Sequence, residues 1–174
     1  MSDCARVAVA SWWCVGSTMS DAGGECILYT DGGARGNPGP AGAGWVLLAP
    51  DGAVLSEGGV FIGTATNNVA EYEALLAGLR VAGAEKCARV EVRSDSELLV
   101  RQMTGAYKVK NAGLKPLFTS ACALVATFQS VRFTHVRREQ NTDADRLANE
   151  AMDACGDVGD AERAAHDRPH DTLF

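Results

Sequence analysis

The 174-residue sequence has no uninterrupted apolar stretch of the roughly 20 residues that a membrane-spanning helix requires. Its most apolar segments, at residues 7–10 and 12–15, are short and separated by serine. Arg6 is the only basic residue among the first 25, and no clean hydrophobic block follows it, as a secretory signal would need. We therefore expect a cytoplasmic protein with no membrane partner.

Sulfur and nitrogen ligands for metals are also scarce. The sequence contains 3 histidines and 6 cysteines, and no two cysteines have the spacing of two to four residues that zinc ribbons and redox motifs use. The cysteines lie at positions 4, 14, 26, 87, 122 and 155. Because disulfides are rare in the cytosol, we expect all of these thiols to be reduced.

The excess of negative charge is confined to the two ends of the chain. The formal net charge is −6, yet residues 26–152 carry 13 basic and 13 acidic side chains. The net charge of the whole chain therefore misrepresents its central part, and a nucleic-acid partner is not excluded there.

One domain is predicted, at residues 26–152. Residues 1–25 have no sustained hydrophobic period and are interpreted as a flexible extension, in which the second Met-Ser-Asp suggests the hypothesis that translation starts at Met19. Residues 153–174 lack an apolar stripe and are interpreted as a flexible acidic tail.

Hydrophobic periodicity divides the central part into alternating strands and helices. Strands are predicted at 26–30, 43–49, 53–62, 89–93 and 131–136, with a loop at 31–40 and a hairpin turn at 50–52. Helices are predicted from an N-cap at Asn67 or Asn68 to Gly83, after Ser96, after Pro116, and around 147–152. Hairpins followed by crossovers predict an α/β fold with a five-stranded mixed sheet, three strands antiparallel and two parallel, and helices on both faces.

Four acidic residues are placed at comparable points of this pattern. Asp31 ends the first strand, Asp95 follows the fourth, and Glu71 and Asp145 lie in the first turns of two helices. Each position also has a structural interpretation, because aspartate before glycine favours turns and acidic residues at helix starts act as caps or complement the helix dipole. All four nevertheless map to one edge of the predicted sheet, where open α/β sheets place their sites.

Carboxylates that converge in this way require a cation. Two of them 4 Å apart repel by about 4 kcal/mol at an effective dielectric constant near 20. Oxygen ligands favour Mg²⁺ or Mn²⁺ over Zn²⁺, and two such ions would activate a water and stabilise the leaving oxygen in phosphodiester cleavage.

Four motifs in order carry a resemblance to a known family. They are Tyr29-Thr-Asp-Gly-Gly-Ala-Arg-Gly-Asn-Pro-Gly-Pro, Thr66-Asn-Asn-Val-Ala-Glu-Tyr, Ser94-Asp-Ser and Asn141-Thr-Asp-Ala-Asp-Arg-Leu-Ala. Residues 26–152 resemble type 1 ribonuclease H. The resemblance implies the ribonuclease H-like fold, two Mg²⁺ or Mn²⁺ ions on Asp31, Glu71, Asp95 and Asp145, and hydrolysis of the RNA strand of an RNA/DNA hybrid by a monomer, with 5′-phosphate and 3′-hydroxyl products.

The resemblance also implies substrate contacts. These are Gly32, Gly33, Asn37, Thr66, Asn67, Asn68, Ser96, Lys108 and Lys110, with a helix cap as the alternative role for Asn68. A histidine of the family corresponds by spacing to His135, ten residues before Asp145. A structural role within its strand is the alternative for His135, and Arg138 is then the other candidate for the catalytic position.

The basic protrusion found in many members of the family is absent. The only basic residues between Gly105 and Pro116 are Lys108, Lys110 and Lys115. We therefore expect the hybrid to bind more weakly and with strong sensitivity to salt. Two other functions stay open: a broader nuclease that also cuts double-stranded RNA, and a non-catalytic hybrid-binding module. The four carboxylates argue against the second, because a pure binder of nucleic acid gains nothing from them.

Overall fold

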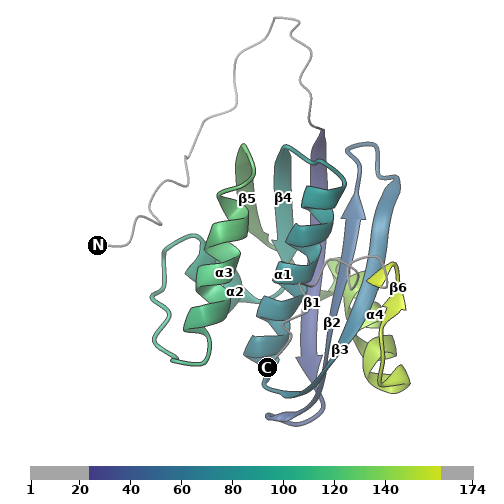
Figure 1. The fold of residues 1–174 in the computed structure, drawn as a ribbon, viewed down its shortest axis with the longest axis vertical. Coiled ribbons are helices and arrows are strands. Elements are labelled where there is room, and N and C mark those ends of the chain that lie inside the picture. Colours follow the sequence, from purple (N-terminus) through teal and green to yellow (C-terminus); the bar gives the residue numbers. More distant parts are fainter. Residues whose placement is uncertain (1–23, 162–174) are drawn as a thin grey trace, which may run out of the picture.

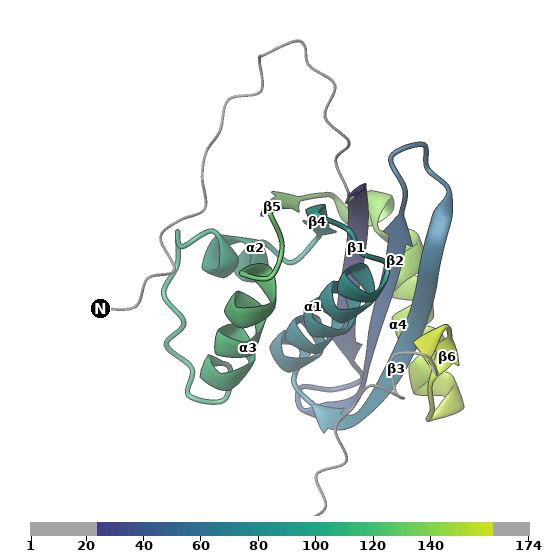
Figure 2. The same cartoon turned by 45° about the horizontal axis from the view of Figure 1, so that its top comes forward.

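A computed structural model describes residues 24–161, which form one mixed sheet covered by helices on both faces (Figure 1). The strand order is β5-β4-β1-β2-β3-β6, in which β1 pairs antiparallel with β2 and parallel with β4. Helices α1, α2 and α3 cover one face and α4 covers the other (Figures 1 and 2). The predicted α/β architecture is confirmed. No helix within residues 24–161 is long and apolar enough to cross a membrane.

The elements follow the predicted order with one addition at the end. The strands are β1 (Glu25–Ala34), β2 (Gly39–Leu48), β3 (Val54–Ala65), β4 (Arg89–Ser94), β5 (Ser130–His135) and β6 (Val158–Gly159). The helices are α1 (Asn67–Ala84), α2 (Glu97–Met103), α3 (Lys115–Val125) and α4 (Thr142–Ala154), with a 3-10 turn, η1, at Arg138–Gln140.

The predicted loop at 31–40 is wrong over most of its length. Strand β1 continues to Ala34, which pairs with Ala41, so Asp31 lies inside the strand and not at its end. The glycine-rich sequence favours a turn, but Gly32 instead allows helix α1 to lie close to strand β1. A Cβ atom at Gly32 would lie 2.2 Å from the carbonyl carbon of Ala70 in α1. Glycine is required there because helix backbone contacts strand backbone.

The N-cap of helix α1 lies one residue before the first of the two predicted caps. The N-cap is Thr66, whose Oγ1 accepts a hydrogen bond from the Val69 amide at 3.4 Å, and not Asn67 or Asn68. The helix therefore starts at Asn67, which places Glu71 in the second turn and not in the first.

The two faces of the sheet are packed differently. On the α1 side, large side chains form the core, and the largest that are fully buried include Trp45, Tyr72, Leu28, Leu47, Leu75 and Leu79. On the α4 side, helix backbone lies directly on strand backbone. Cβ atoms at Gly42 and Gly44 would lie 2.3 Å and 2.2 Å from the carbonyl oxygens of Ala148 and Ala144.

The fold extends past the predicted domain boundary at 152. Strand β6 pairs with β3 through Gly58 and Gly59, and Ala161 is buried in the core, with 1% of its surface exposed. The sheet therefore has six strands and not five, because a strand of two residues leaves no detectable period in the sequence. Residues 1–23 of the predicted extension, the hypothesis on Met19 and the end of the predicted tail lie outside the described residues, whereas Glu25 belongs to β1.

Two cysteines form a disulfide, so the expectation that all thiols are reduced is wrong for them. Cys26 at the start of β1 is bonded to Cys87, which precedes β4, across 61 residues of sequence. Both side chains are buried in the core. The parallel pairing of β1 with β4 brings these segments together, whereas a search for closely spaced cysteines cannot detect such a pair.

The close contact of α4 predicts that Gly44→Ala destabilises the protein. The added methyl group would overlap the Ala144 carbonyl, and overpacking of this kind costs about 1–3 kcal/mol in the free energy of unfolding. Gly33→Ala is the matched control, because no atom lies within 4 Å of a Cβ built at Gly33. Urea unfolding of both variants measures the difference, and equal stability of the two would contradict the packing argument.

The disulfide predicts a fold that is sensitive to reductant. A cross-link over 61 residues restricts the unfolded chain, and such bonds contribute typically about 2–4 kcal/mol. We expect dithiothreitol to lower the melting temperature of the wild type. The melting temperature of the double variant Cys26→Ala/Cys87→Ala should not respond to the reductant, and an equal response in both proteins would rule out this origin.

Candidate active site

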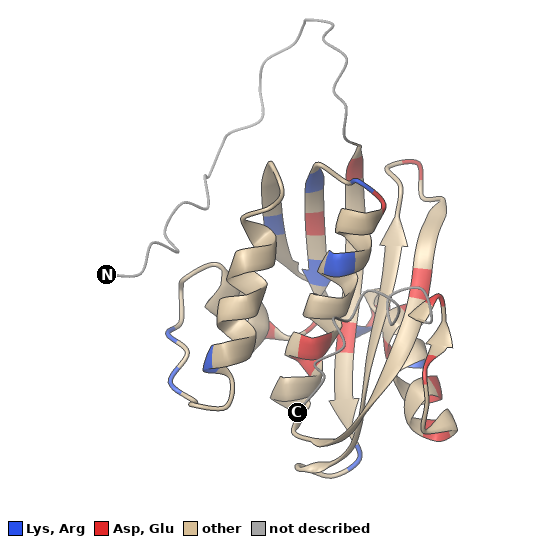
Figure 3. Cartoon of the chain, viewed as in Figure 1, with Lys and Arg blue, Asp and Glu red and all other residues tan. Residues whose placement is uncertain are grey.

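Four carboxylates approach one another from four elements. The parallel pairing of β1 with β4 sets Thr30 beside Ser94, so Asp31 and Asp95 follow at the same level of adjacent strands. Glu71 comes from α1 on one face of the sheet, and Asp145 comes from the first turn of α4 on the other. The structure therefore brings the four predicted acids together, and acidic positions of β1 and α1 are seen near one another in Figure 3.

The environment of Asp31 strongly disfavours its charged form. Burial, then the adjacent Asp95 carboxyl, and then the charges of Asp145 and Glu71 raise the pKa of Asp31 to about 8. Burial and neighbouring carboxylates both disfavour the charged form of a carboxyl, and a nearby positive charge favours it. This is the electrostatic condition under which a bound cation stabilises the site.

Glu71 is held by the N-cap residue of the neighbouring helix. Burial raises the pKa of Glu71 to about 7, and the Asp95 charge adds to this, while a hydrogen bond from the Ser96 hydroxyl acts in the opposite direction. Ser96 is the N-cap of α2 and accepts a hydrogen bond from the Leu99 amide at 3.3 Å. One hydroxyl thus fixes both the helix start and the glutamate.

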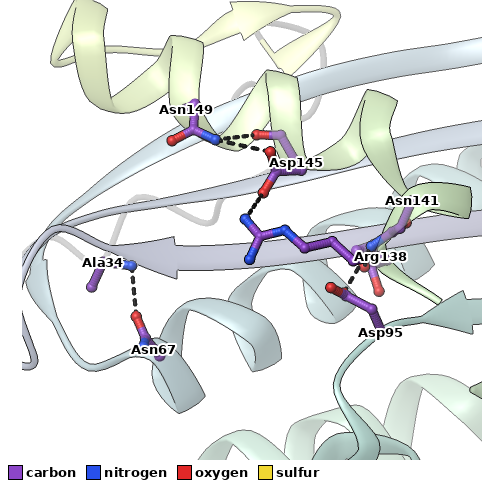
Figure 4. Close-up of polar contacts among 8 residues, drawn as sticks. Ala34, Asn67, Asp95, Arg138, Asn141, Asp145 and Asn149 are labelled. Atoms are coloured by element: carbon purple, nitrogen blue, oxygen red, sulfur yellow. Dashed lines mark hydrogen bonds and ion pairs between the residues drawn. The ribbon is translucent and has the colours of Figure 1, made fainter. Parts of the chain in front are cut away.

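Asn141 is a site residue that the sequence analysis did not single out. Its side chain is buried, and its Nδ2 donates to Asp95 Oδ1 and to the Thr30 carbonyl, each at 3.0 Å (Figure 4). It therefore ties the end of β4 to β1 immediately before Asp31. An asparagine before a helix is ordinarily interpreted as a cap, but this side chain makes no capping hydrogen bond.

Both oxygens of the Asp145 carboxylate have partners. Arg138 donates from its Nη2 to Oδ1 at 2.7 Å, and Asn149, one turn further along α4, donates from Nδ2 to Oδ2 at 3.2 Å (Figure 4). The predicted alternative to His135 is therefore in direct contact with one of the four carboxylates.

His135 is the last residue of β5 and is exposed. Its Nε2 lies 3.2 Å from the backbone carbonyl oxygen of Asp95, and its position in the sheet is opposite Ser94. The ring thus contacts the backbone beside the cluster. The assignment between His135 and Arg138 remains a prediction from the sequence.

Four of the predicted substrate contacts lie where the first hairpin meets the start of α1. Asn67 Oδ1 accepts from the Ala34 amide at 2.8 Å, and Asn37 Oδ1 accepts from the Asn67 amide at 3.3 Å. Asn68 is exposed beside them, and Thr66 caps the helix. These contacts fix the hairpin end of β1 against α1, next to the carboxylates (Figure 4).

Apart from Ser96, which holds Glu71, the remaining predicted contacts lie on backbone and on a loop. Strand β4 ends at Ser94, opposite Thr30, so residues 31–34, which include Gly32 and Gly33, have a strand partner only in β2. Lys108 lies exposed and Lys110 follows it in the connection between α2 and α3, on the α1 side of the sheet (Figure 3). This loop is separate from the carboxylates (Figure 3).

Comparisons with known proteins agree with this arrangement. The family description "Reverse transcriptase-like" matches residues 29–151. Ribonuclease HI of Halobacterium salinarum is 47% identical over 133 residues, which cover 76% of this chain and 67% of that protein. A bifunctional protein of Mycobacterium tuberculosis is 47% identical over 139 residues, and the match covers 79% of this chain but only 38% of that longer protein.

Solved structures give the same result. The crystal structure of RNase H1 from Halobacterium salinarum superimposes with a TM-score of 0.74 at 46% identity, covering 75% of this chain and 99% of the other. LC11-RNase H1, solved in complex with an RNA/DNA hybrid, has a TM-score of 0.72 at 47% identity, covering 75% of this chain and 98% of that one.

This chain belongs to the type 1 ribonuclease H family. The spacing of its acids, the strand order and the four motifs are now accounted for together, and the chain is a ribonuclease H.

The donors present fit divalent ions in this ribonuclease H. The four side chains offer only carboxylate oxygens, which hard cations prefer, and the raised pKa of Asp31 reflects a demand for positive charge. Within residues 24–161, however, no three Asp, Glu, His or Cys side chains are already gathered closely enough to hold one ion. Hydrogen bonds from Ser96, Asn141 and Arg138 occupy three of the carboxylates, so side-chain rearrangement must accompany binding.

From the raised pKa of Asp31 we predict that the free energy of unfolding decreases with rising pH when chelator is present. Its pKa is about 8 in the folded chain, against an ordinary value of 3.8, so between those values the folded chain holds the additional proton. The free energy of unfolding therefore decreases as pH rises through this range. Asp31→Asn should flatten this dependence and raise the melting temperature at pH 8.

Asp157→Asn is the matched control, because Asp157 is an exposed aspartate outside the cluster. Melting temperatures measured from pH 5 to about pH 8 in chelator test the prediction. An Asp31→Asn profile that runs parallel to the wild-type profile would contradict it.

Proposed function

We propose that this ribonuclease H hydrolyses the RNA strand of RNA/DNA hybrids with two Mg²⁺ or Mn²⁺ ions, leaving 5′-phosphate and 3′-hydroxyl ends. The observation that carries the proposal is the convergence of Asp31, Glu71, Asp95 and Asp145 from β1, α1, the end of β4 and α4. The relative LC11-RNase H1, which was solved with an RNA/DNA hybrid, supports the choice of substrate.

In this proposal the four carboxylates would hold the ions, which would supply an activated water and stabilisation of the leaving oxygen. The chain contributes orientation. Ser96 directs Glu71, and Asn141 directs Asp95 through a buried hydrogen bond. Because both partners are anchored to backbone, at the start of α2 and at Thr30, they orient the two carboxylates before the rearrangement that binding of an ion requires.

Recognition of RNA is assigned to the backbone of β1 and to the neighbouring asparagines. Residues 31–34 have no strand on the β4 side, and no atom lies within 4 Å of the position that a Cβ atom would take at Gly33. A nucleic acid can therefore approach the main chain closely, and 2′-hydroxyl groups are what distinguish RNA from DNA at such a surface. Asn37 and Asn67 stiffen this edge and present polar groups beside it.

Cleavage of a strand-labelled hybrid tests the proposal. We expect the RNA strand of the hybrid to be cut with Mg²⁺ or Mn²⁺ and to stay intact with chelator, while DNA/DNA duplexes are untouched. Asp31→Asn and Asp95→Asn should abolish turnover, because each removes a charged ligand from the cluster. Asp157→Asn, in an exposed position, should cleave at the wild-type rate.

The same assay separates the alternatives. Cutting of an RNA/RNA duplex in parallel would identify the broader nuclease. Hybrid binding without cleavage in either metal would overturn the enzymatic proposal in favour of a binding module. Full activity in Asp31→Asn or Asp95→Asn would refute the assignment of the site.

A further inference from the structure

We propose that Arg138 competes with a divalent metal ion for the Asp145 carboxylate, and so acts as a built-in counter-cation that metal binding displaces. The inference rests on the proposed metal-dependent function and adds a determinant of metal affinity to it. It concerns binding of the ions before any nucleic acid is present.

The geometry places the Arg138 guanidinium where a cation is needed. It extends from η1 toward α4, and its Nη2 lies 2.7 Å from Asp145 Oδ1 (Figure 4). The positive charge is therefore at the cluster and not merely on the same surface.

The charge of Arg138 interacts with more than one carboxylate. Asp145 first, through its charge and its hydrogen bond, and then Asp31 and Asp95 raise the pKa of the Arg138 guanidinium. The guanidinium therefore carries a positive charge that interacts with three of the four carboxylates. It thus supplies part of the compensation that a divalent ion would otherwise supply.

Of the two partners of Asp145, Arg138 is the one that can leave. Asn149 is anchored, because its Nδ2 also donates to the Asp145 backbone carbonyl at 2.8 Å within α4. The Arg138 side chain is 74% exposed, against 30% for Asp145, so its guanidinium can be rehydrated at little cost when it moves away. A metal ion that takes Oδ1 therefore displaces arginine and leaves Asn149 in place.

The competition predicts tighter metal binding when Arg138 is removed. An exposed ion pair of this kind changes an equilibrium constant by about two- to fivefold, so Arg138→Gln should bind Mn²⁺ tighter by about that factor. Isothermal titration of Mn²⁺ into the full chain, without nucleic acid, measures the affinity directly. The matched control is Arg137→Gln, which removes the same charge from the adjacent exposed residue.

The outcomes separate the inference from the function on which it rests. Wild-type affinity in Arg137→Gln with tighter binding in Arg138→Gln supports the competition. Equal affinity in wild type and Arg138→Gln, or equal gains in both variants, overturns the inference and leaves the metal site intact. Absence of Mn²⁺ binding by the wild type overturns the proposed metal site as well.

A measurement on the wild type keeps the inference testable should Arg138→Gln fail to fold. The Nε–Hε signal of Arg138 in a ¹⁵N NMR spectrum reports on its ion pair. Addition of Mg²⁺, which is diamagnetic, should move this signal toward that of a solvated arginine. A signal that stays unchanged while Mg²⁺ saturates the site would overturn the competition.

Discussion

The active site depends on how closely two helices approach the backbone of the sheet. Gly32 and Gly44 lie on adjacent strands, and a Cβ atom at either would collide with a helix, α1 on one face and α4 on the other. Asp31 pairs with Gly44 in the β1–β2 ladder and precedes Gly32 in the chain. It is therefore next to both of these close contacts. Because the helices pack directly on glycine backbone, Glu71 and Asp145 lie close enough for their charges to interact with Asp31. Larger residues at these glycines would separate the helices from the strands and would disperse the carboxylates.

The four carboxylates repel one another, and neighbouring hydrogen-bond donors reduce this repulsion for some of them more than for others. Glu71, Asp95 and Asp145 accept hydrogen bonds from Ser96, Asn141 and Arg138, whereas Asp31 faces the carboxyl of Asp95. This difference explains why the pKa of Asp31 reaches about 8, while that of Glu71 reaches about 7 against the opposing hydrogen bond from Ser96. Each of the three donors is also a group that must share its carboxylate when a cation binds. The hydrogen bonds thus orient the carboxylates, but within residues 24–161 they do not gather three of them closely enough to hold one ion.

The sequence predicted the order of the elements and the four carboxylates, because periodicity and ordered motifs are properties of the chain itself. It misassigned residues 31–34 because glycine has the same sequence signal in a turn and at a close approach, and only the position of α1 distinguishes the two. It missed Asn141 because a buried side chain that reaches Thr30 across 111 residues looks identical, in sequence, to a helix cap. The pairing of Cys26 with Cys87 was missed for a similar reason, since parallel strands bring them together across 61 residues. Each of these three errors concerns a contact between distant parts of the chain.

The stability of the fold and the chemistry of the site are placed on different parts of the sheet. The large buried side chains and the disulfide lie on the α1 side or at the start of β1, away from Asp31. The α4 side packs three alanines, Leu147 and Met152 against a sheet surface that includes Gly42 and Gly44, and it carries Asp145. Because raised carboxyl pKa values mean that ionisation weakens the folded state, the cluster opposes folding near neutral pH, and the core must compensate. A cation that bound the ionised carboxylates of the folded chain alone would remove this opposition, and the proposed metal binding would then be linked to folding stability through the same four side chains.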